Sequence, residues 1–210
     1  MKKLLFFSLL LIAVTSFGQQ FPQNNTRGQQ FSFEYWHKGY LILEGGDTLR
    51  GQLKYNLQTD LVQLQDNSHL ETYTARKVVF FEIFDALQNE YRRFFSLPFA
   101  ATGGYKAPVF FELLSEGKMT LLAREALEYK TYSSFYYYGS YTRLVLVYKY
   151  FLLEEDGDIN EFIGRKNDWI YAMGNQGEQV QKYVKSNKLD FDDKKDLTRI
   201  VEYYNSFFKK

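Results

Sequence analysis

Hydrophobic and polar residues alternate along several short segments of this chain. In residues 48–55, leucine, glycine and tyrosine occupy one set of alternate positions, and arginine, glutamine and lysine occupy the other. A period of two residues is typical of a strand with one buried and one solvated face. The turn-forming sequence Gly45-Gly46-Asp47 precedes this segment. Residues 39–44 and 48–55 are therefore predicted to form a β-hairpin.

The same reasoning predicts further strands in the first three quarters of the chain. They are expected at residues 61–65, 70–74, 79–84, 91–97, 109–114, 118–124, 144–153 and 159–163. Residues 144–153 are almost continuously apolar, which favours a central place in the sheet. Residues 126–142 break the alternation with a run of tyrosines and are not assigned to a strand.

After residue 163 the hydrophobic period lengthens to that of a helix. Asn167 and Asp168 are expected to cap a short helix that ends at Ala172, and residues 176–186 form a second. A third is expected to begin at Asp192 or Asp193 and to run to about Phe208. Its apolar residues follow helical i, i+3, i+4, i+7 spacing and are Leu197, Ile200, Val201, Tyr204 and Phe207.

Strands first and helices last indicate an α+β fold rather than a parallel β/α fold. The prediction is an antiparallel, strongly curved β-sheet or partly closed barrel over residues 33–163, followed by two or three C-terminal α-helices in residues 164–210. Three prolines leave no proline-rich linker to divide the chain. Residues 33–210 are therefore expected to form a single domain.

The first 18 residues have the organisation of a secretory signal peptide. Lys2 and Lys3 precede an apolar run over residues 4–14, and Ser16 and Gly18 are the small residues that a signal peptidase reads. Cleavage is expected between Gly18 and Gln19, and residues 19–32 are interpreted as a flexible leader. The protein is thus predicted to be exported, to the periplasm, the outer membrane or the extracellular space, with no transmembrane span once the signal is removed.

Composition narrows the possible chemistry. Removal of Lys2 and Lys3 leaves 24 basic against 25 acidic residues, a net charge of −1, which gives no reason to expect nucleic acid as a partner. The chain has no cysteine, so thiol catalysis and thiolate metal sites are excluded. A disulfide-free exported domain points to a bacterium. We expect no cofactor and no metal, although His37, His69 and a carboxylate would form a metal site if they converged.

The sequence contains no motif of a nucleotide-binding loop, a zinc protease or a serine hydrolase, and no catalytic residue is assigned. One enzymatic alternative remains, a carboxylate-dependent glycan hydrolase. Glu82 and Glu112 occupy matching positions in two similar segments and would have to face each other, as glycosidase carboxylates do. A further, weaker alternative is an outer-membrane β-barrel, because the predicted strands are numerous and rich in aromatic residues.

Aromatic residues make up 19% of the chain, and many of its tyrosines gather in residues 129–141. Tyrosine offers a large, fairly rigid contact area and a hydroxyl, which suits peptide or glycan surfaces. The candidate binding residues are Tyr132, Phe135, Tyr136, Tyr137, Tyr138 and Tyr141. The favoured function is an exported, non-catalytic envelope binding or assembly protein, whose partner is an envelope protein or a glycan.

Several longer segments resemble a family of secreted, uncharacterised proteins from Bacteroidota. They are KGYLILEGGDTLRGQLKY at residues 38–55, RRFFSLPF at 92–99, FFELLSEGK at 110–118, VKSNKL at 184–189 and DLTRIVEYYNS at 196–206. The resemblance implies an exported bacterial protein, and it implies no activity, cofactor or catalytic residue.

Overall fold

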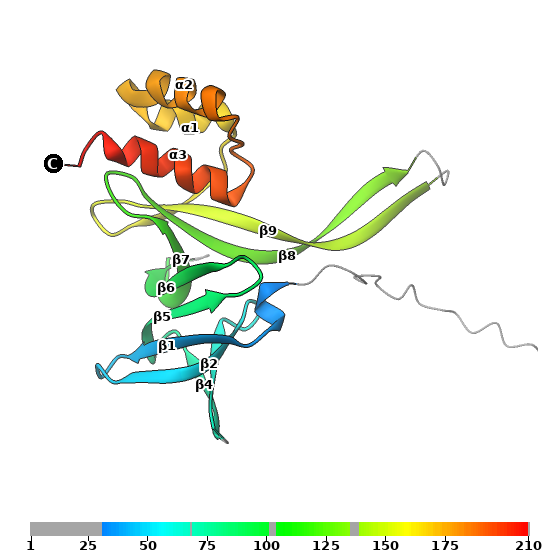
Figure 1. Cartoon of the computed structure of the whole chain (residues 1–210), viewed down its shortest axis with the longest axis vertical. Coiled ribbons are helices and arrows are strands. Elements are labelled where there is room, and N and C mark those ends of the chain that lie inside the picture. The colour runs from blue at the N-terminus through cyan, green and yellow to red at the C-terminus, as the bar shows by residue number, and fades with distance from the viewer. Residues whose placement is uncertain (1–30, 68, 101–103, 135–138, 210) are drawn as a thin grey trace, which may run out of the picture.

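The computed structural model describes residues 31–67, 69–100, 104–134 and 139–209. These residues form one ten-stranded antiparallel sheet and three C-terminal α-helices (Figure 1). The order of strands across the sheet is β10-β9-β8-β7-β6-β5-β1-β2-β3-β4. The helices lie beside the end of the sheet that contains β7, β8 and β9 (Figure 1). The α+β class and the order of strands before helices are therefore confirmed.

The strands agree with the alternation pattern over most of the chain. Their bounds are β1 His37–Leu43, β2 Thr48–Asn56, β3 Leu61–Asp66, β4 His69–Thr74, β5 Val78–Asp85, β6 Glu90–Phe99, β7 Ala107–Ser115, β8 Thr120–Ser134, β9 Gly139–Leu153 and β10 Ile159–Phe162. The largest difference lies in residues 126–142. The sequence pattern ends the strands before and after this segment, whereas β8 and β9 continue through most of it, as strands of 15 residues each.

The sheet is open, so the expectation of a strongly curved sheet or partly closed barrel was wrong. Within the described ranges, the edge strands β4 and β10 each pair with a single neighbour, β3 and β9 respectively. Alternation specifies that each strand buries one face, but it does not specify whether the two edges meet. In this chain the helices cover apolar residues of β7–β10, so these residues are buried without closure of the sheet.

Directly paired residues of an antiparallel sheet point to the same face. The register runs from Leu41 through Phe81, Phe94, Glu112 and Ala123 to Tyr150, which places all six on one face. An aromatic core built on Phe81 and Phe94 lies at the N-terminal end of this face. The helices pack near Tyr150 at the other end. Glu112 lies between the two cores.

The aromatic core is held by ring contacts between strands that are not all neighbours. The ring centroid of Tyr55 in β2 lies 5.6 Å from Phe81, 5.4 Å from Phe94 and 5.8 Å from Phe110 in β7. A third apolar cluster, built on Phe111, Leu122 and Phe151, lies on the opposite face of the sheet. Both faces of the central strands are therefore covered with apolar side chains.

The three helices are α1 Lys166–Ala172, α2 Gly177–Asn187 and α3 Lys194–Ser206. Asp193 caps α3, because its side chain accepts a hydrogen bond from the backbone N–H of Asp196. The apolar spacing predicted for this helix is confirmed at four positions, since Leu197, Ile200, Val201 and Tyr204 are buried. The first helix begins two residues earlier than an N-cap at Asn167 predicts, because Arg165 is at the N-cap.

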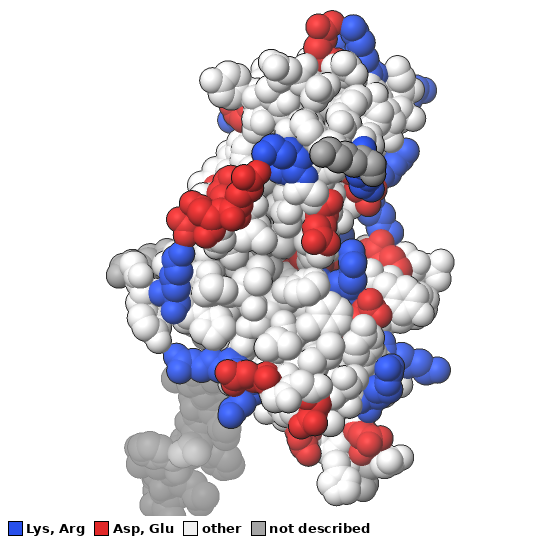
Figure 2. Space-filling model, turned by 90° about the vertical axis from the view of Figure 1, so that its left-hand side faces the viewer, with Lys and Arg blue, Asp and Glu red and all other residues white. Residues whose placement is uncertain are grey.

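The described part of the chain begins in contact with the sheet. Phe31 and Ser32, assigned to the leader by sequence, are 5% and 7% exposed. Within the described ranges, no helix combines the length and the apolar character needed to cross a membrane. On the face drawn in Figure 2, basic and acidic side chains are interspersed, as they are along the sequence.

Candidate binding surface on the β8–β9 hairpin

Strands β8 and β9 extend well beyond the rest of the sheet. They pair continuously from Thr120 with Leu153 to Ser134 with Gly139. The neighbouring strand β7 pairs with β8 only as far as Ala123, and β10 pairs with β9 only from Tyr150. Residues 124–134 and 139–149 thus form a two-stranded projection, here called the arm, which leaves the body of the molecule (Figure 1).

Two of the predicted binding residues meet on the arm. Tyr132 and Tyr141 are direct cross-strand partners, and their rings stack with centroids 5.5 Å apart and planes 20° apart. The guanidinium of Arg143 lies 4.7 Å from the Tyr132 ring centroid, in a cation–π contact. Tyr141 remains 52% exposed. The other four predicted residues, Phe135, Tyr136, Tyr137 and Tyr138, lie outside the described residues.

The two faces of the arm differ in chemistry. Tyr132, Tyr141 and Arg143 share their face with two pairs of directly opposed cations, Lys130 with Arg143 and Arg124 with Lys149. Like charges in direct opposition destabilise a strand pair, so this face is not optimised for the stability of the arm. The other face is uncharged along its outer half, where Tyr129 lies opposite Leu144 and Thr131 bonds Thr142 at 2.8 Å.

At the base of the arm, strands β7 and β8 separate and leave a fork between residues 107–111 and residues 124–127. Asp60, in the turn between β2 and β3, binds inside this fork. Its carboxylate accepts hydrogen bonds from the Phe110 backbone N–H at 3.1 Å, the Tyr55 hydroxyl at 2.5 Å and the Arg124 guanidinium at 3.3 Å. The β7 donor at this point is therefore satisfied by a side chain and not by β8.

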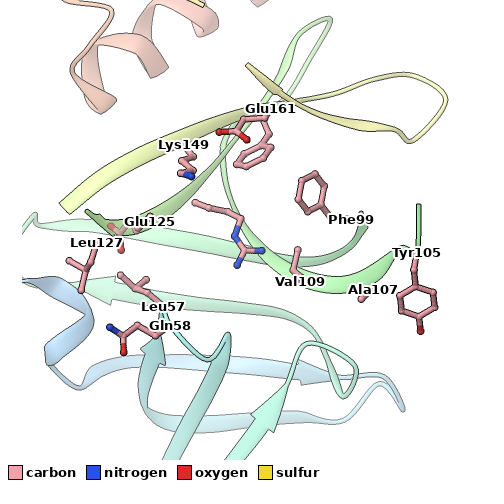
Figure 3. Close-up of a pocket in the computed structure, with 13 residues that line it drawn as sticks. Leu57, Gln58, Phe99, Tyr105, Ala107, Val109, Glu125, Leu127, Lys149 and Glu161 are labelled. Atoms are coloured by element: carbon pink, nitrogen blue, oxygen red, sulfur yellow. The ribbon is translucent and has the colours of Figure 1, made fainter. Parts of the chain in front are cut away.

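A pocket of about 630 Å³ opens in the fork. Its apolar lining includes Phe99, Val109 and Phe151, and Arg124, Lys149 and Glu161 supply charged groups. Figure 3 shows Leu57 and Gln58 on one side of the pocket, with Glu125, Lys149 and Glu161 across from them. The pocket thus combines an apolar lining, charged side chains and the backbone of β8 where that strand has no β7 partner.

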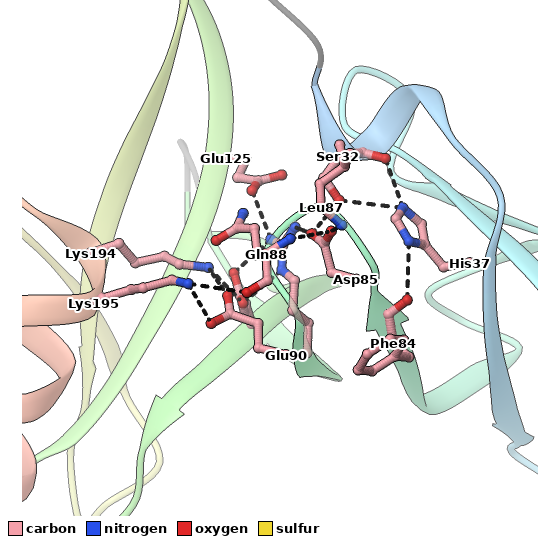
Figure 4. A network of polar contacts seen from close by, with 12 residues as sticks. Ser32, His37, Phe84, Asp85, Leu87, Gln88, Glu90, Glu125, Lys194 and Lys195 are labelled. Atoms are coloured by element: carbon pink, nitrogen blue, oxygen red, sulfur yellow. Dashed lines mark hydrogen bonds and ion pairs between the residues drawn. The ribbon is translucent and has the colours of Figure 1, made fainter.

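A buried polar network occupies the sheet face between the two cores (Figure 4). Arg92 on β6 donates two hydrogen bonds to Glu112, at 2.8 and 2.7 Å, and one to Glu125 at 2.7 Å. Lys194, at the start of α3, reaches the same Glu112 carboxylate at 3.1 Å. The network therefore links β6, β7, β8 and the helical part of the chain.

The charges of this network shift the acidities of its carboxyl groups. Burial alone would raise the pKa of Glu112, but Arg92 and Lys194 outweigh burial and lower the pKa to about 2. For Glu125 burial prevails over the attraction of Arg92, and its pKa is raised above the ordinary value. Because all three side chains of the Arg92–Glu112–Glu125 group are at most 5% exposed, the arrangement is a structural ion cluster closed to solvent.

The carboxylate pair expected of a glycan hydrolase is not formed. Glu112 lies directly opposite Phe94, whereas Glu82 lies opposite Arg93, the next residue along β6. Successive residues of a strand point to opposite faces, so the two carboxylates are on opposite sides of the sheet. Sequence similarity between the two segments therefore did not translate into a shared site.

The two histidines also lie in different environments. His37 is 5% exposed, and its ring nitrogens contact the backbone carbonyls of Phe84 at 3.3 Å and Ser32 at 2.8 Å. His69 is exposed on the edge strand β4. In the described part of the chain, no group of three or more histidine, aspartate or glutamate side chains is arranged to hold a metal ion.

Comparison of the chain with protein-family models, with curated proteins and with solved structures found no match. The candidate surface therefore rests on the geometry of the molecule.

Three residues near the candidate surface and in the buried network were not predicted from the sequence: Asp60, Arg92 and Arg124. A signal existed for Arg92, which shares strand parity with buried Phe94 and so was placed to face inward. Asp60 and Arg124 carried no such signal, because their meeting depends on the separation of β7 and β8.

Proposed function

We propose that this protein is an exported, non-catalytic binding or assembly protein of the bacterial envelope, and that it holds its partner through the arm. The observation that carries the proposal is the Tyr132–Tyr141 stack with Arg143, in which Tyr141 is exposed and Tyr132 half-buried, on a hairpin that projects from the body of the protein. The partner is an envelope protein or a glycan. Export is supported by the signal-peptide pattern of residues 1–18.

The physical argument is one of contact area and preorganisation. Tyrosine rings lose little conformational freedom on binding, and here each ring is already restrained by its cross-strand neighbour. The directly opposed pair Lys130 and Arg143 adds positive charge beside the rings. An arrangement that costs the arm stability and exposes aromatic surface is typical of a surface kept for a partner.

The test is site-specific photo-crosslinking in the bacterial host. A photoreactive phenylalanine analogue is placed at position 132, 141 or 171, in separate otherwise unchanged full-length chains. Tyr171 is the matched control, because it is 89% exposed on α1 and belongs to no part of the arm. We expect the same crosslinked partner at positions 132 and 141, and none at position 171.

The double variant Tyr132→Ser/Tyr141→Ser is expected to lose capture of the crosslinked partner in a pull-down from envelope extract, while Tyr171→Ser retains it. Circular dichroism and the unfolding midpoint establish that each variant is folded. Equal capture by the double variant and by Tyr171→Ser would remove the arm surface from the proposal.

A further inference from the structure

The fork between β7 and β8 differs from an ordinary sheet edge. At an ordinary edge a strand has one neighbour and faces solvent, as β4 and β10 do here. In the fork, the pairing of β7 with β8 ends at Ala123, and β8 continues for eleven more residues that pair with β9. The edge of β8 over residues 124–128 thus has no strand paired with it among the described residues, and a pocket lies along its start.

In the described part of the chain the fork is asymmetric, because a side chain binds the backbone of β7 and none binds the facing backbone of β8. The Phe110 N–H of β7 donates to Asp60, so this backbone donor is already satisfied. Among the described residues, no hydrogen bond engages the backbone of residues 124–128 on the side away from β9. Backbone N–H and C=O groups are strong hydrogen-bonding groups, and an unpaired strand edge is a template for another strand.

The pocket next to this edge indicates what the added strand would carry. Phe99, Val109 and Phe151 offer an apolar surface of the size that receives one or two apolar side chains. Arg124 and Lys149 are directly opposed on the pocket side of β8 and β9. Arg124 is only partly neutralised by Asp60 at 3.3 Å, and Lys149 is 3.9 Å from Glu128. An acidic group placed between the two cations would relieve their repulsion.

We propose that the fork binds an extended polypeptide segment of a partner protein by β-strand addition to residues 124–128 of β8. The segment places an apolar side chain in the pocket and an acidic group between Arg124 and Lys149. In this mode main-chain hydrogen bonds supply affinity, and alternate side chains supply specificity. The inference rests on the proposed binding function and names its partner class.

The experiment uses the purified full chain and synthetic probe peptides. The first probe is a seven-residue, end-blocked peptide of alternating valine and threonine with one glutamate, and the second has lysine in place of the glutamate. A third repeats the first with N-methyl groups on alternate residues, which removes the donors that face β8. Amide hydrogen exchange is followed by mass spectrometry with and without each probe.

We expect the glutamate probe to slow exchange in residues 124–128. N-methylation should weaken binding by at least about tenfold, the factor that follows from losing one or two net backbone hydrogen bonds. The lysine probe should bind more weakly than the glutamate probe. In Lys149→Gln this preference should fall about three- to fivefold, as for one exposed ion pair. In the control Lys130→Gln, which removes a cation from the same face of the arm away from the pocket, the preference should persist.

Protection confined to β4 or β10 would overturn the proposal, because the probe would then bind an ordinary edge of the sheet and not the fork. A second outcome would also overturn the proposal. If exchange in residues 124–128 becomes slower as the protein concentration rises in the absence of any probe, the occupant of the fork is a second copy of this chain. An equal loss of preference in Lys149→Gln and Lys130→Gln would remove the acidic group from the proposal.

These outcomes are distinct from the test of the proposed function. Crosslinking at Tyr132 and Tyr141 without peptide protection at the fork would leave the arm as the binding surface and reject strand addition. Protection at the fork in a chain that gives no crosslink at either tyrosine would reject the aromatic surface and keep the fork.

Discussion

At the scale of single residues, Arg92 is the buried cation around which the carboxylates of the ion cluster are arranged. It is 3% exposed, and its guanidinium is shared between Glu112 and Glu125, with Asp85 at 3.6 Å. A buried cation of this kind is stable only when its partners are in place, because an unpaired buried charge costs several kcal/mol. Lys194 of α3 is also buried and pairs with Glu112, so it too depends on this carboxylate being in place.

The pKa of Glu112 predicts how stability depends on pH. Its folded-state pKa is about 2, below the ordinary 4.5, so its ion pairs stabilise the fold fully above pH 4.5 and are lost as the pH falls towards 2. The loss amounts to about 3 kcal/mol. The pKa of Glu125 is raised on folding, so this carboxyl affects stability at pH values above its ordinary pKa of 4.5. In that range a fall in pH protonates Glu125 in the folded state first and therefore favours the folded state.

Urea unfolding at several pH values measures this effect. The wild-type chain should lose stability steeply between pH 4.5 and 2, and Glu112→Gln should be less stable at pH 7 and show a flatter dependence below pH 4.5. The control is Glu155→Gln, which removes an exposed, solvent-screened ion pair with Lys118 and should change the slope much less than Glu112→Gln does. If Glu112→Gln keeps the wild-type slope, the acid sensitivity belongs to other groups.

Residue-level expectations from sequence were accurate where the environment is local and inaccurate where it is not. The Asp193 cap and the buried positions of α3 follow from helical spacing within a few residues. The roles of Glu112 and His37 depend on residues distant in the sequence. A single glutamate in an alternating strand gives no indication that an arginine and a lysine will meet it from two other elements.

At the scale of elements, the arm is a separate case from the rest of the sheet. Strands β1 and β5–β7 each lie between two neighbours, whereas the described strand pairing of residues 124–134 is with residues 139–149 alone. Isolated two-stranded ribbons have marginal stability in water, because each residue buries little apolar surface. The stacked tyrosines and the Thr131–Thr142 hydrogen bond support the outer part of the arm, which carries the candidate binding surface.

This arrangement predicts a gradient of local stability along one hairpin. Native-state hydrogen exchange should be slowest in residues 120–123 and 150–153, where β7 and β10 flank the pair, and faster in residues 129–133 and 140–144. Residues 61–65 of β3, which lie between β2 and β4, provide an internal reference. Uniform protection along β8 would show that the arm is as stable as the body and would contradict the prediction.

The sequence pattern located most strands but not the length of β8 and β9. Alternation of apolar and polar residues indicates a strand with one buried face. In the outer arm, residues 129–133 and 139–144, neither face is buried. Its tyrosines are exposed or half-buried on both sides of the ribbon. The pattern is interrupted for the same physical reason that makes the outer part of the arm a candidate surface: the side chains of residues 129–133 and 139–144 are not buried in a core.

At the scale of the whole molecule, the helices are fixed to the sheet by packing, by the ion pair of Lys194 with Glu112 and by the amide side chain of Asn205. Asn205 of α3 is 2% exposed and reaches the turn between β7 and β8. Its amide accepts from the Met119 N–H and donates to the Met119 carbonyl, both at 2.9 Å, and it also donates to the Ser115 hydroxyl at 3.1 Å. The Gly117 backbone approaches Asn205 so closely that a Cβ there would lie 2.7 Å from the Asn205 side chain.

Asn205→Ala is expected to lower the free energy of unfolding by about 2–3 kcal/mol, because it leaves buried backbone groups of Met119 without partners. The matched control is Asn187→Ala at the end of α2, where the side chain is exposed and donates a hydrogen bond to the Tyr183 carbonyl within its own helix. Urea unfolding of both variants measures the difference. Equal midpoints for the two would mean that the Asn205 contacts add little to the attachment of α3.

The overall class of the fold was predictable, and its closure was not. The change of period near residue 163 separates strands from helices and is a local property of the sequence. Whether ten strands close depends on twist, stagger and what covers the exposed faces, which are properties of the whole sheet. Here α3 and its neighbours cover the residues around Leu121 and Tyr150, and the edges β4 and β10 do not meet.

The buried network has a consequence for how the chain assembles. A slip of β6 by one residue that moves Tyr91 to the position of Arg92 would turn Arg92 to the other face of the sheet. Glu125 would then be enclosed without its arginine, and Glu112 would keep only Lys194. The same slip would place Arg93 at the position of Phe94 in the aromatic core. Mispairing of β6 in this direction therefore carries the electrostatic cost of unpaired buried charges.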